Sequence, residues 1–259
     1  MAPIRLAILE ADTPVPQANA QYKGYLGVFT HLFTRAVAPE PLESVLTITG
    51  HDIVAFPSTA YPNLDEIDAV LITGSKYNSF DNDDWILSLV EFTRKALIHP
   101  RVKVIGVCFG HQIVARAMGC LVRRSDKGWE VSVTETTLTE KGKEIFGNHE
   151  SLKIQQMHRD QVYGLPAGSH LLASTEKCPN HGFLVPNRVI TIQGHPEFTS
   201  EIMNEILVLR HGTGLFTDEV FESGMQCNGD HHDGVDVTKV FIKFLQGEFD
   251  EQEDSSAPK

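Results

Sequence analysis

The sequence predicts an α/β fold in which helices cover both faces of an open, mostly parallel β-sheet. In the first half of the chain, short apolar runs of strand length alternate with amphipathic stretches of helical spacing, which is the pattern of parallel strands joined by crossover helices. The apolar share of 41% and the charged share of 22% are ordinary for a folded chain. We expect one domain over residues 1–246, with an irregular insertion over 212–234 and an acidic, flexible tail over 247–259.

The N-terminal half supplies the first strands and helices. Residues 4–9 form a compact apolar run, and the apolar residues between Tyr25 and Val37 recur at three- and four-residue steps. This pattern predicts a strand followed by an amphipathic helix. Further strands are expected at residues 45–49, 68–73 and 102–107, with helices at 85–98, where Pro100 ends the helix, and at 108–119.

The pattern changes after Gly119. Residues 130–137 alternate like an exposed strand, and strands are also expected at 152–157, 171–174, 183–185 and 189–193. Ser200 begins a helix, and residues 241–245 close the fold.

A possible nucleophile lies between the predicted strand 102–107 and the helix that follows it. Gly106-Val-Cys108-Phe-Gly110 has the form G-x-nucleophile-x-G, and a nucleophile on such a strand-to-helix turn needs small neighbours so that the backbone can pass close by. The N-terminus of the helix carries partial positive charge that stabilises a thiolate. The context predicts that Cys108 is a catalytic nucleophile.

A possible base and its orienting group follow the last predicted core strand. His195 and Glu197, separated by Pro196, lie at the end of residues 189–193. The carboxyl ends of parallel strands meet at one edge of a sheet, so His195 is expected near Cys108. A cysteine nucleophile needs a base that a third group holds in one tautomer, and Glu197 is placed to be that group.

The two motifs GVCFGHQ and GHPEF resemble those of the class I glutamine amidotransferase family, most of all its stand-alone, γ-glutamyl-peptidase-like branch. ITGSKYNSFDNDDWI resembles the oxyanion-loop region of the family, MHRDQVYGLP its substrate-side loop, and LLASTEKCP the strand after that loop. The resemblance implies a flavodoxin-like, three-layer fold. It also implies a cysteine hydrolase that cleaves the γ-glutamyl amide bond of glutamine or of γ-glutamyl peptides through a γ-glutamyl thioester.

The resemblance also implies roles for individual residues. Cys108 would attack the γ-carbonyl, His195 would transfer the proton, and Glu197 would orient His195. The backbone N–H groups of Ser75 and Phe109 would form the oxyanion hole. The expected substrate-binding residues are Gly74, Gln112, His158 and Arg159.

The oxyanion loop departs from the commoner family pattern of two glycines and a proline, because this chain has Gly74-Ser75-Lys76. We expect Lys76 to place a cation at the mouth of the pocket, where an extended anionic leaving group would reach it. Such a contact would favour γ-glutamyl peptides over glutamine. The alternative is that Lys76 is simply an exposed lysine.

No cofactor and no metal ion are expected. The run Asp230-His231-His232-Asp233 has metal-binding residue types, but consecutive residues seldom converge on one ion, so a solvated loop is the preferred interpretation. His111 lies beside the strand-to-helix turn of Cys108, and its side chain is expected to point behind the thiol rather than to act as the base.

The net charge of −12 argues against binding to nucleic acids or to anionic membranes, since no strong basic patch offsets it. The N-terminus does not match a signal peptide, no stretch is long and apolar enough to span a membrane, and the four cysteines form no CxxC pair. We therefore expect a cytoplasmic protein that acts on a small γ-glutamyl molecule.

Three other functions stay open. The chain could be a glutaminase subunit that supplies ammonia to a separate synthase subunit, or a non-catalytic interaction module with the same fold. A cysteine-elbow chaperone or deglycase would need a glutamate near the cysteine and would lack the HPE motif.

Overall fold

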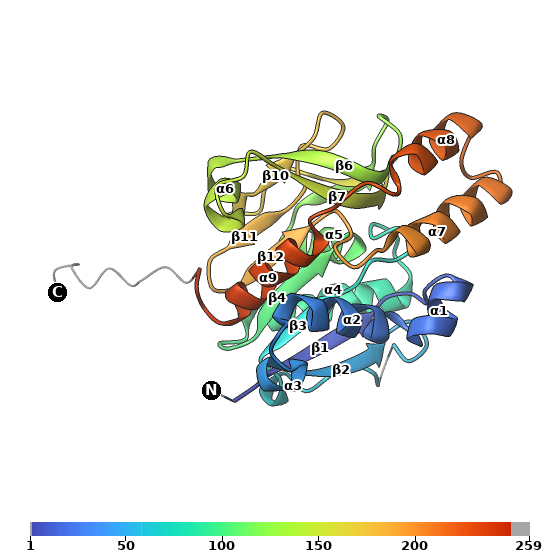
Figure 1. The fold of residues 1–259 in the computed structure, drawn as a ribbon. Helices are drawn as coiled ribbons and strands as arrows, with labels where there is room; N and C mark the ends of the chain where they lie inside the picture. Colours follow the sequence, from blue (N-terminus) through green and yellow to red (C-terminus); the bar gives the residue numbers. More distant parts are fainter. Residues whose placement is uncertain (1, 58, 250–259) are drawn as a thin grey trace.

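An open β-sheet built from distant parts of the sequence forms the centre of the molecule. The protein is described by a computed structural model over residues 2–57 and 59–249, in which seven strands lie in the order β2-β1-β3-β4-β12-β11-β9 (Figure 1). The strands are β1 (Ile4–Glu10), β2 (Leu46–Asp52), β3 (Ala69–Ile72), β4 (Lys103–Val107), β9 (His170–Leu171), β11 (Phe183–Val185) and β12 (Val189–Ile192). The pairs from β2 to β12 are parallel and the last two are antiparallel. The predicted open, mostly parallel sheet is confirmed.

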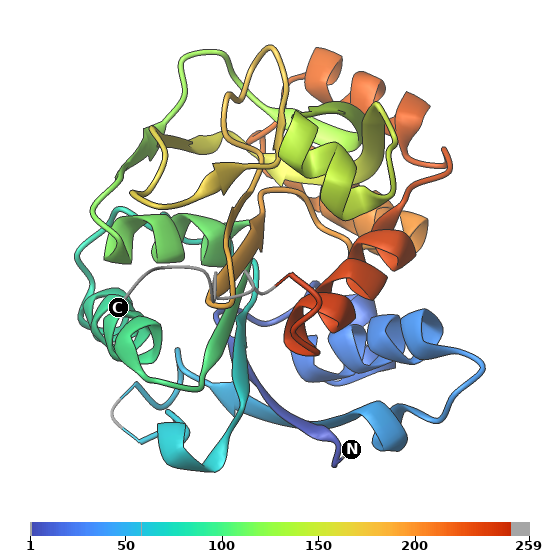
Figure 2. The ribbon, with the colours of Figure 1, turned by 90° about the vertical axis from the view of Figure 1, so that its left-hand side faces the viewer.

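Helices cover both faces of this sheet, as Figure 2 shows with the sheet between two helical layers. One face packs against α2 (Tyr25–Val37) and α9 (Gly234–Leu245), and the other against α4 (Asp84–Ile98) and α5 (Phe109–Ala117). Each helix buries an apolar stripe; in α2 the buried residues include Val28, Phe29, Leu32 and Phe33. Burial of such stripes is the main stabilising contribution of these layers.

A smaller antiparallel sheet lies beside the carboxyl end of β12 in the main sheet. It contains β6 (Glu130–Leu138), β7 (Ser151–His158) and β10 (Ala173–Ser174). The backbone N–H of His195 donates to the carbonyl of Gln155 in β7 at 2.8 Å. This bridge joins the smaller sheet directly to the segment that follows β12.

The prediction of an irregular insertion over residues 212–234 is wrong, because this stretch contains helix α8 (Asp218–Cys227). The Thr217 hydroxyl caps the helix by accepting from the N–H of Val220, and two acidic residues stand in the first turn, which is favourable for a helix N-terminus. The preceding helix α7 (Ser200–Gly212) is capped in the same way by Thr199. Of the tail predicted over 247–259, residues 250–259 lie outside the described part of the chain.

The strand expected at residues 171–174 is divided between two sheets, since β9 joins the main sheet and β10 the smaller one. The remaining elements are α1 (Pro16–Tyr22), α3 (Leu42–Val45), the 3₁₀ turn η1 (Leu64–Glu66), α6 (Glu140–Phe146), and the paired strands β5 (Leu121–Arg124) and β8 (Asp160–Tyr163). None of the described helices has the length and apolarity that a membrane crossing requires.

Candidate active site

Cys108 lies on a tight turn between β4 and α5. Its backbone has φ 51° and ψ −103°, a conformation that is strained for a residue with a side chain. The two glycines of the motif permit the turn: a Cβ on Gly106 would lie 2.8 Å from the carbonyl atoms of Gly110, and one on Gly110 would lie 2.1 Å from the carbonyl oxygen of Ile72. Only glycine fits at either position, so the thiol is held at the N-terminus of α5.

The imidazole of His195 is fixed between two neighbours. Its Nδ1 lies 2.8 Å from Oε1 of Glu197, and its ring stacks on Phe198 with centroids 4.0 Å apart and planes 4° apart. His195 and Glu197 are both buried. Glu197 therefore sets the tautomer and orientation of the ring, as the orienting member of a nucleophile–base–acid triad does.

His195 is also coupled to the thiol of Cys108. Burial lowers the pKa of His195, but Cys108 and Glu197 raise it more, through their charges and through hydrogen bonds to the ring, and the resulting pKa is about 10. An imidazole held between a cysteine and a carboxylate is the arrangement of a cysteine–histidine nucleophile. The structure thus brings together the three residues that the sequence nominated as catalytic.

The loop after β3 lies against both members of the nucleophile–base pair. A Cβ built on Gly74 would lie 2.6 Å from Cε1 of His195 and 3.7 Å from Cβ of Cys108. Among the described residues, no acceptor is found for the N–H of Ser75, and the N–H of Phe109 belongs to the first turn of α5, where helix donors have no partner within the helix. Both residues line the same cavity as Cys108.

Lys76 differs from the expectation of a free cation. Its ammonium pairs with Oδ1 of Asp12 at 2.8 Å, and its backbone N–H donates to Oδ2 of the same carboxylate at 2.8 Å. Asp12 is nearly buried, whereas Lys76 is exposed. The pair anchors the oxyanion loop to the end of β1, and its opposite charges remove the basis for Lys76 as the recognition site of an anionic leaving group.

The thiol opens into a cavity of about 340 Å³. Besides the loop residues, the cavity is lined by three arginines, and two of them, Arg159 and Arg210, lie over the ring of Trp129 at 5.1 and 5.2 Å from its centroid. The third, Arg124, pairs with Asp160. Sequence reasoning did not find Trp129, Arg124 or Arg210, because each comes from a segment with no recognisable local motif.

Gln112 and His158 line this cavity, and their side chains also face other protein groups. The Gln112 amide accepts from Ser79 and donates to the carbonyl of Asp160 and to Gln193. Nε2 of His158 faces the carboxylate of Glu130 at 3.2 Å. Both residues therefore hold the wall of the cavity in place.

His111 and the run 230–233 take the positions expected of non-catalytic residues. His111 is buried behind the elbow with Nδ1 2.9 Å from Oγ1 of Thr191, and burial lowers the pKa of His111 to about 3. In the run, the carboxylate of Asp233 accepts from the N–H of Lys153, while the side chain of His231 is exposed.

Comparisons with known proteins agree with this geometry. The model of the family described as glutamine amidotransferase class-I matches residues 44–210. A glutamine amidotransferase-like protein of Schizosaccharomyces pombe is 35% identical, with 93% of this chain and 98% of that protein covered. Gamma-glutamyl peptidase 3 of Arabidopsis thaliana is 35% identical over 78% of this chain and 80% of its own. The crystal structure of a glutamine amidotransferase from Thermotoga maritima superimposes with a TM-score of 0.69, at 16% identity, over 95% of this chain and 99% of that one. The chain belongs to the class I glutamine amidotransferase family.

Proposed function

We propose that the protein is a cysteine hydrolase that cleaves the γ-glutamyl amide bond of γ-glutamyl peptides in preference to that of free glutamine. The observation that carries the hydrolase proposal is the Cys108 thiol on its strained turn, coupled to the His195–Glu197 pair and open to a cavity. Cys108 attacks the γ-carbonyl, and the N–H groups of Ser75 and Phe109 stabilise the oxyanion that forms.

Proton transfer by His195 completes each half of the reaction. His195 takes the proton of the Cys108 thiol as sulfur attacks, and the imidazolium gives this proton to the departing amine as the tetrahedral intermediate collapses to the γ-glutamyl thioester. The neutral imidazole then takes a proton from the water that attacks the thioester. As the second tetrahedral intermediate collapses, the imidazolium returns this proton to sulfur, so glutamate leaves and the thiol is regenerated. Glu197 holds the ring in one orientation through both steps, because Oε1 accepts from Nδ1 at 2.8 Å.

A second cavity on the side of His195 supports a leaving group larger than ammonia. It also measures about 340 Å³, and it shares the lining residues Ser75, Lys76, Met157 and Arg210 with the cavity at Cys108. The group that receives the proton from His195 must leave on this side. Its apolar lining is formed by Pro14, Val15, Pro16, Tyr25, Phe198, Ile206 and Leu209, which favours a leaving amine with an apolar side chain.

Sequence similarity to gamma-glutamyl peptidases of Arabidopsis thaliana supports this proposal, because the chain is 30–35% identical to them. The γ-glutamyl part of the substrate would occupy the cavity at Cys108. Arg159 and Arg210 line that cavity, and a guanidinium is suited to hold the α-carboxylate of the γ-glutamyl group.

The test compares the kcat/KM of the purified protein on γ-glutamyl-leucine, glutathione and glutamine, with Cys108→Ser as the inactive control. We expect γ-glutamyl-leucine to be cleaved most efficiently. Equal efficiency on glutamine would contradict the peptidase proposal and favour a glutaminase that serves a synthase. No turnover of any γ-glutamyl amide would contradict the hydrolase proposal itself.

Leu209→Ser tests the second cavity. Removing about half of the burial of one leucine costs about 1 kcal/mol, so kcat/KM on γ-glutamyl-leucine should fall about fivefold while kcat/KM on glutamine stays unchanged. Val208→Ser is the matched control, since Val208 is the preceding residue on α7, is similarly exposed and does not line this cavity. An equal loss on both substrates would refute the assignment of the leaving group to this cavity.

A further inference from the structure

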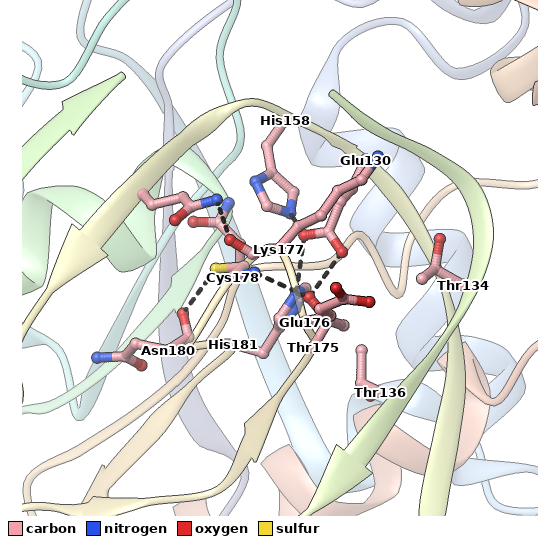
Figure 3. A network of polar contacts seen from close by, with 12 residues as sticks. Glu130, Thr134, Thr136, His158, Thr175, Glu176, Lys177, Cys178, Asn180 and His181 are labelled. Atoms are coloured by element: carbon pink, nitrogen blue, oxygen red, sulfur yellow. Dashed lines mark hydrogen bonds and ion pairs between the residues drawn. The ribbon is translucent and has the colours of Figure 1, made fainter. Parts of the chain in front are cut away.

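Four buried side chains with metal-binding atoms converge beside the active-site cavity. They are Glu130, His158, Cys178 and His181, whose ligand atoms all lie within 4.8 Å of one another. Their exposed fractions are 6%, 3%, 0% and 1%. Figure 3 shows the side chains pointing toward one another from β6, from the end of β7 and from the loop between β10 and β11.

The backbone positions these residues independently of any ion. Glu130 and His158 are directly opposite each other in the β6–β7 ladder. Cys178 and His181 belong to a Cys-x-x-His turn, in which the N–H of Cys178 donates to Oγ1 of Thr175 at 3.0 Å. The Thr175 hydroxyl in turn donates to Oε1 of Glu130 at 2.7 Å. Oε2 of Glu130 is therefore left facing the two histidines.

Two of the distances among these atoms are close to the edge length of a small coordination tetrahedron. Oε2 of Glu130 lies 3.2 Å from Nε2 of His158 and 3.1 Å from Nε2 of His181. Ligands at the usual Zn–N and Zn–O distances of about 2.0–2.2 Å are about 3.3–3.6 Å apart in a tetrahedron. Sγ of Cys178 lies within 4.8 Å of the other three ligand atoms. To reach the fourth corner it would give up its 3.4 Å contact with the carbonyl of Asn180.

Both ring nitrogens of His158 face oxygen atoms. Nδ1 of His158 faces the carbonyl oxygen of Asp160 at 3.3 Å, and Nε2 faces the Glu130 carboxylate. A neutral imidazole has one N–H, so it can donate to only one of these two acceptors. Metal-bound histidines commonly donate from the second nitrogen to a backbone carbonyl and bind the ion through the first, which is the arrangement seen here.

We propose that Glu130, His158, Cys178 and His181 bind one divalent transition-metal ion of the Zn²⁺ type, which ties β6 and β7 to the Cys178–His181 turn behind the active-site cavity. A thiolate, two imidazoles and a carboxylate form a ligand set suited to zinc and unsuited to Mg²⁺ or Ca²⁺. On binding, Cys178 releases its thiol proton to solvent, and the two histidines bind as neutral imidazoles.

Two members of the cluster reach hollows in the surface. His158 lines the cavity at Cys108, and Glu130 and Thr175 line a separate surface hollow. No metal site was expected from the sequence, although the Cys178-x-x-His181 spacing is one that metal-binding turns use.

The experiment uses untagged protein, stripped with a chelator and titrated with Co²⁺. We expect one Co²⁺ per chain, with the visible absorption of tetrahedral cobalt and a near-ultraviolet thiolate-to-cobalt band, both abolished when Zn²⁺ displaces the cobalt. Cys178→Ser should remove the thiolate band, and His181→Gln should weaken Co²⁺ binding at least about tenfold. Cys227→Ser and His231→Gln are the matched controls and should leave both signals unchanged.

Several results would overturn the proposal. These are no binding of Co²⁺ at micromolar concentration, a thiolate band that persists in Cys178→Ser, or binding that is lost in His231→Gln. Because Cys178→Ser could fail to fold, X-ray absorption of the zinc-loaded wild type gives an independent answer. One sulfur among the zinc ligands is expected, and a shell of nitrogen and oxygen alone would contradict the assignment.

Discussion

Gly74→Ala should inactivate the enzyme by displacing the base or the oxyanion loop, although it replaces no catalytic side chain. The new Cβ would lie 2.6 Å from Cε1 of His195, whereas ordinary van der Waals contact begins near 3.4 Å. The ring cannot simply yield, because it is stacked on Phe198 on one side and bonded to Glu197 through Nδ1. Either the oxyanion loop or the imidazole must move by about 0.8 Å, the difference between those two distances.

The magnitude follows from the sensitivity of catalysis to position. A misplacement of about 1 Å can cost about 100-fold in rate, which corresponds to about 2.7 kcal/mol of transition-state stabilisation. We expect kcat/KM on a chromogenic γ-glutamyl anilide to fall by about that factor. The backbone of Gly74 does not have a positive φ, so alanine is compatible with its conformation and the loss should arise from the contact with His195.

The control is Gly229→Ala, since nothing lies within 4 Å of a Cβ at that position and its φ is also not positive. Steady-state kinetics and thermal unfolding would be measured for both variants. The reasoning fails if Gly74→Ala keeps kcat/KM within about twofold of the wild type, less than about 0.4 kcal/mol, or if Gly229→Ala loses as much activity.

Three further predictions concern the nucleophile, the pH profile and stability. Cys108→Ser should lower kcat more than about 1,000-fold with the fold intact, while Cys120→Ser stays near wild type; similar losses in the two would refute the assignment. Because the pKa of His195 is about 10, kcat/KM should fall as pH rises through about 10. Glu197→Gln removes a group that raises this pKa, so the fall in kcat/KM should begin at lower pH. Glu197→Gln should also lower kcat/KM less than His195→Ala does. A pH profile that does not shift, or a larger loss in Glu197→Gln than in His195→Ala, would contradict the triad. Thr139 caps α6 and donates to the carbonyl of Leu171, so Thr139→Ala should lower the free energy of unfolding by about 1 kcal/mol, which denaturant titration would measure.

The sequence was most informative where structure is local. The elbow at Cys108 depends on residues within two positions of the thiol, and the His195-Pro196-Glu197 segment places base and orienting group two residues apart. Apolar periodicity was sufficient to locate the main strands and the helices α2, α4 and α5, because each buries a stripe that recurs along its own sequence.

Features that depend on tertiary packing could not be predicted. Arg210 reaches the cavity only because α7 packs beside it, and the pairing of the smaller sheet brings Trp129 close to two arginines. The Lys76–Asp12 pair joins segments that are 64 residues apart. The α8 helix was missed because half of its residues are polar and Gly224 is its one buried residue, although its Thr217 cap was visible in the sequence.

The strained backbone at Cys108 serves the chemistry of this site but lowers the stability of the chain. A non-glycine residue held at φ 51° costs on the order of 1–3 kcal/mol, a notable fraction of the about 5–15 kcal/mol that separates folded from unfolded protein. Glycine at this position would relieve that strain and remove the nucleophile. Selection or design for thermal stability alone would therefore favour the replacement of Cys108. A relative that carries glycine here would be expected to be more stable and inactive.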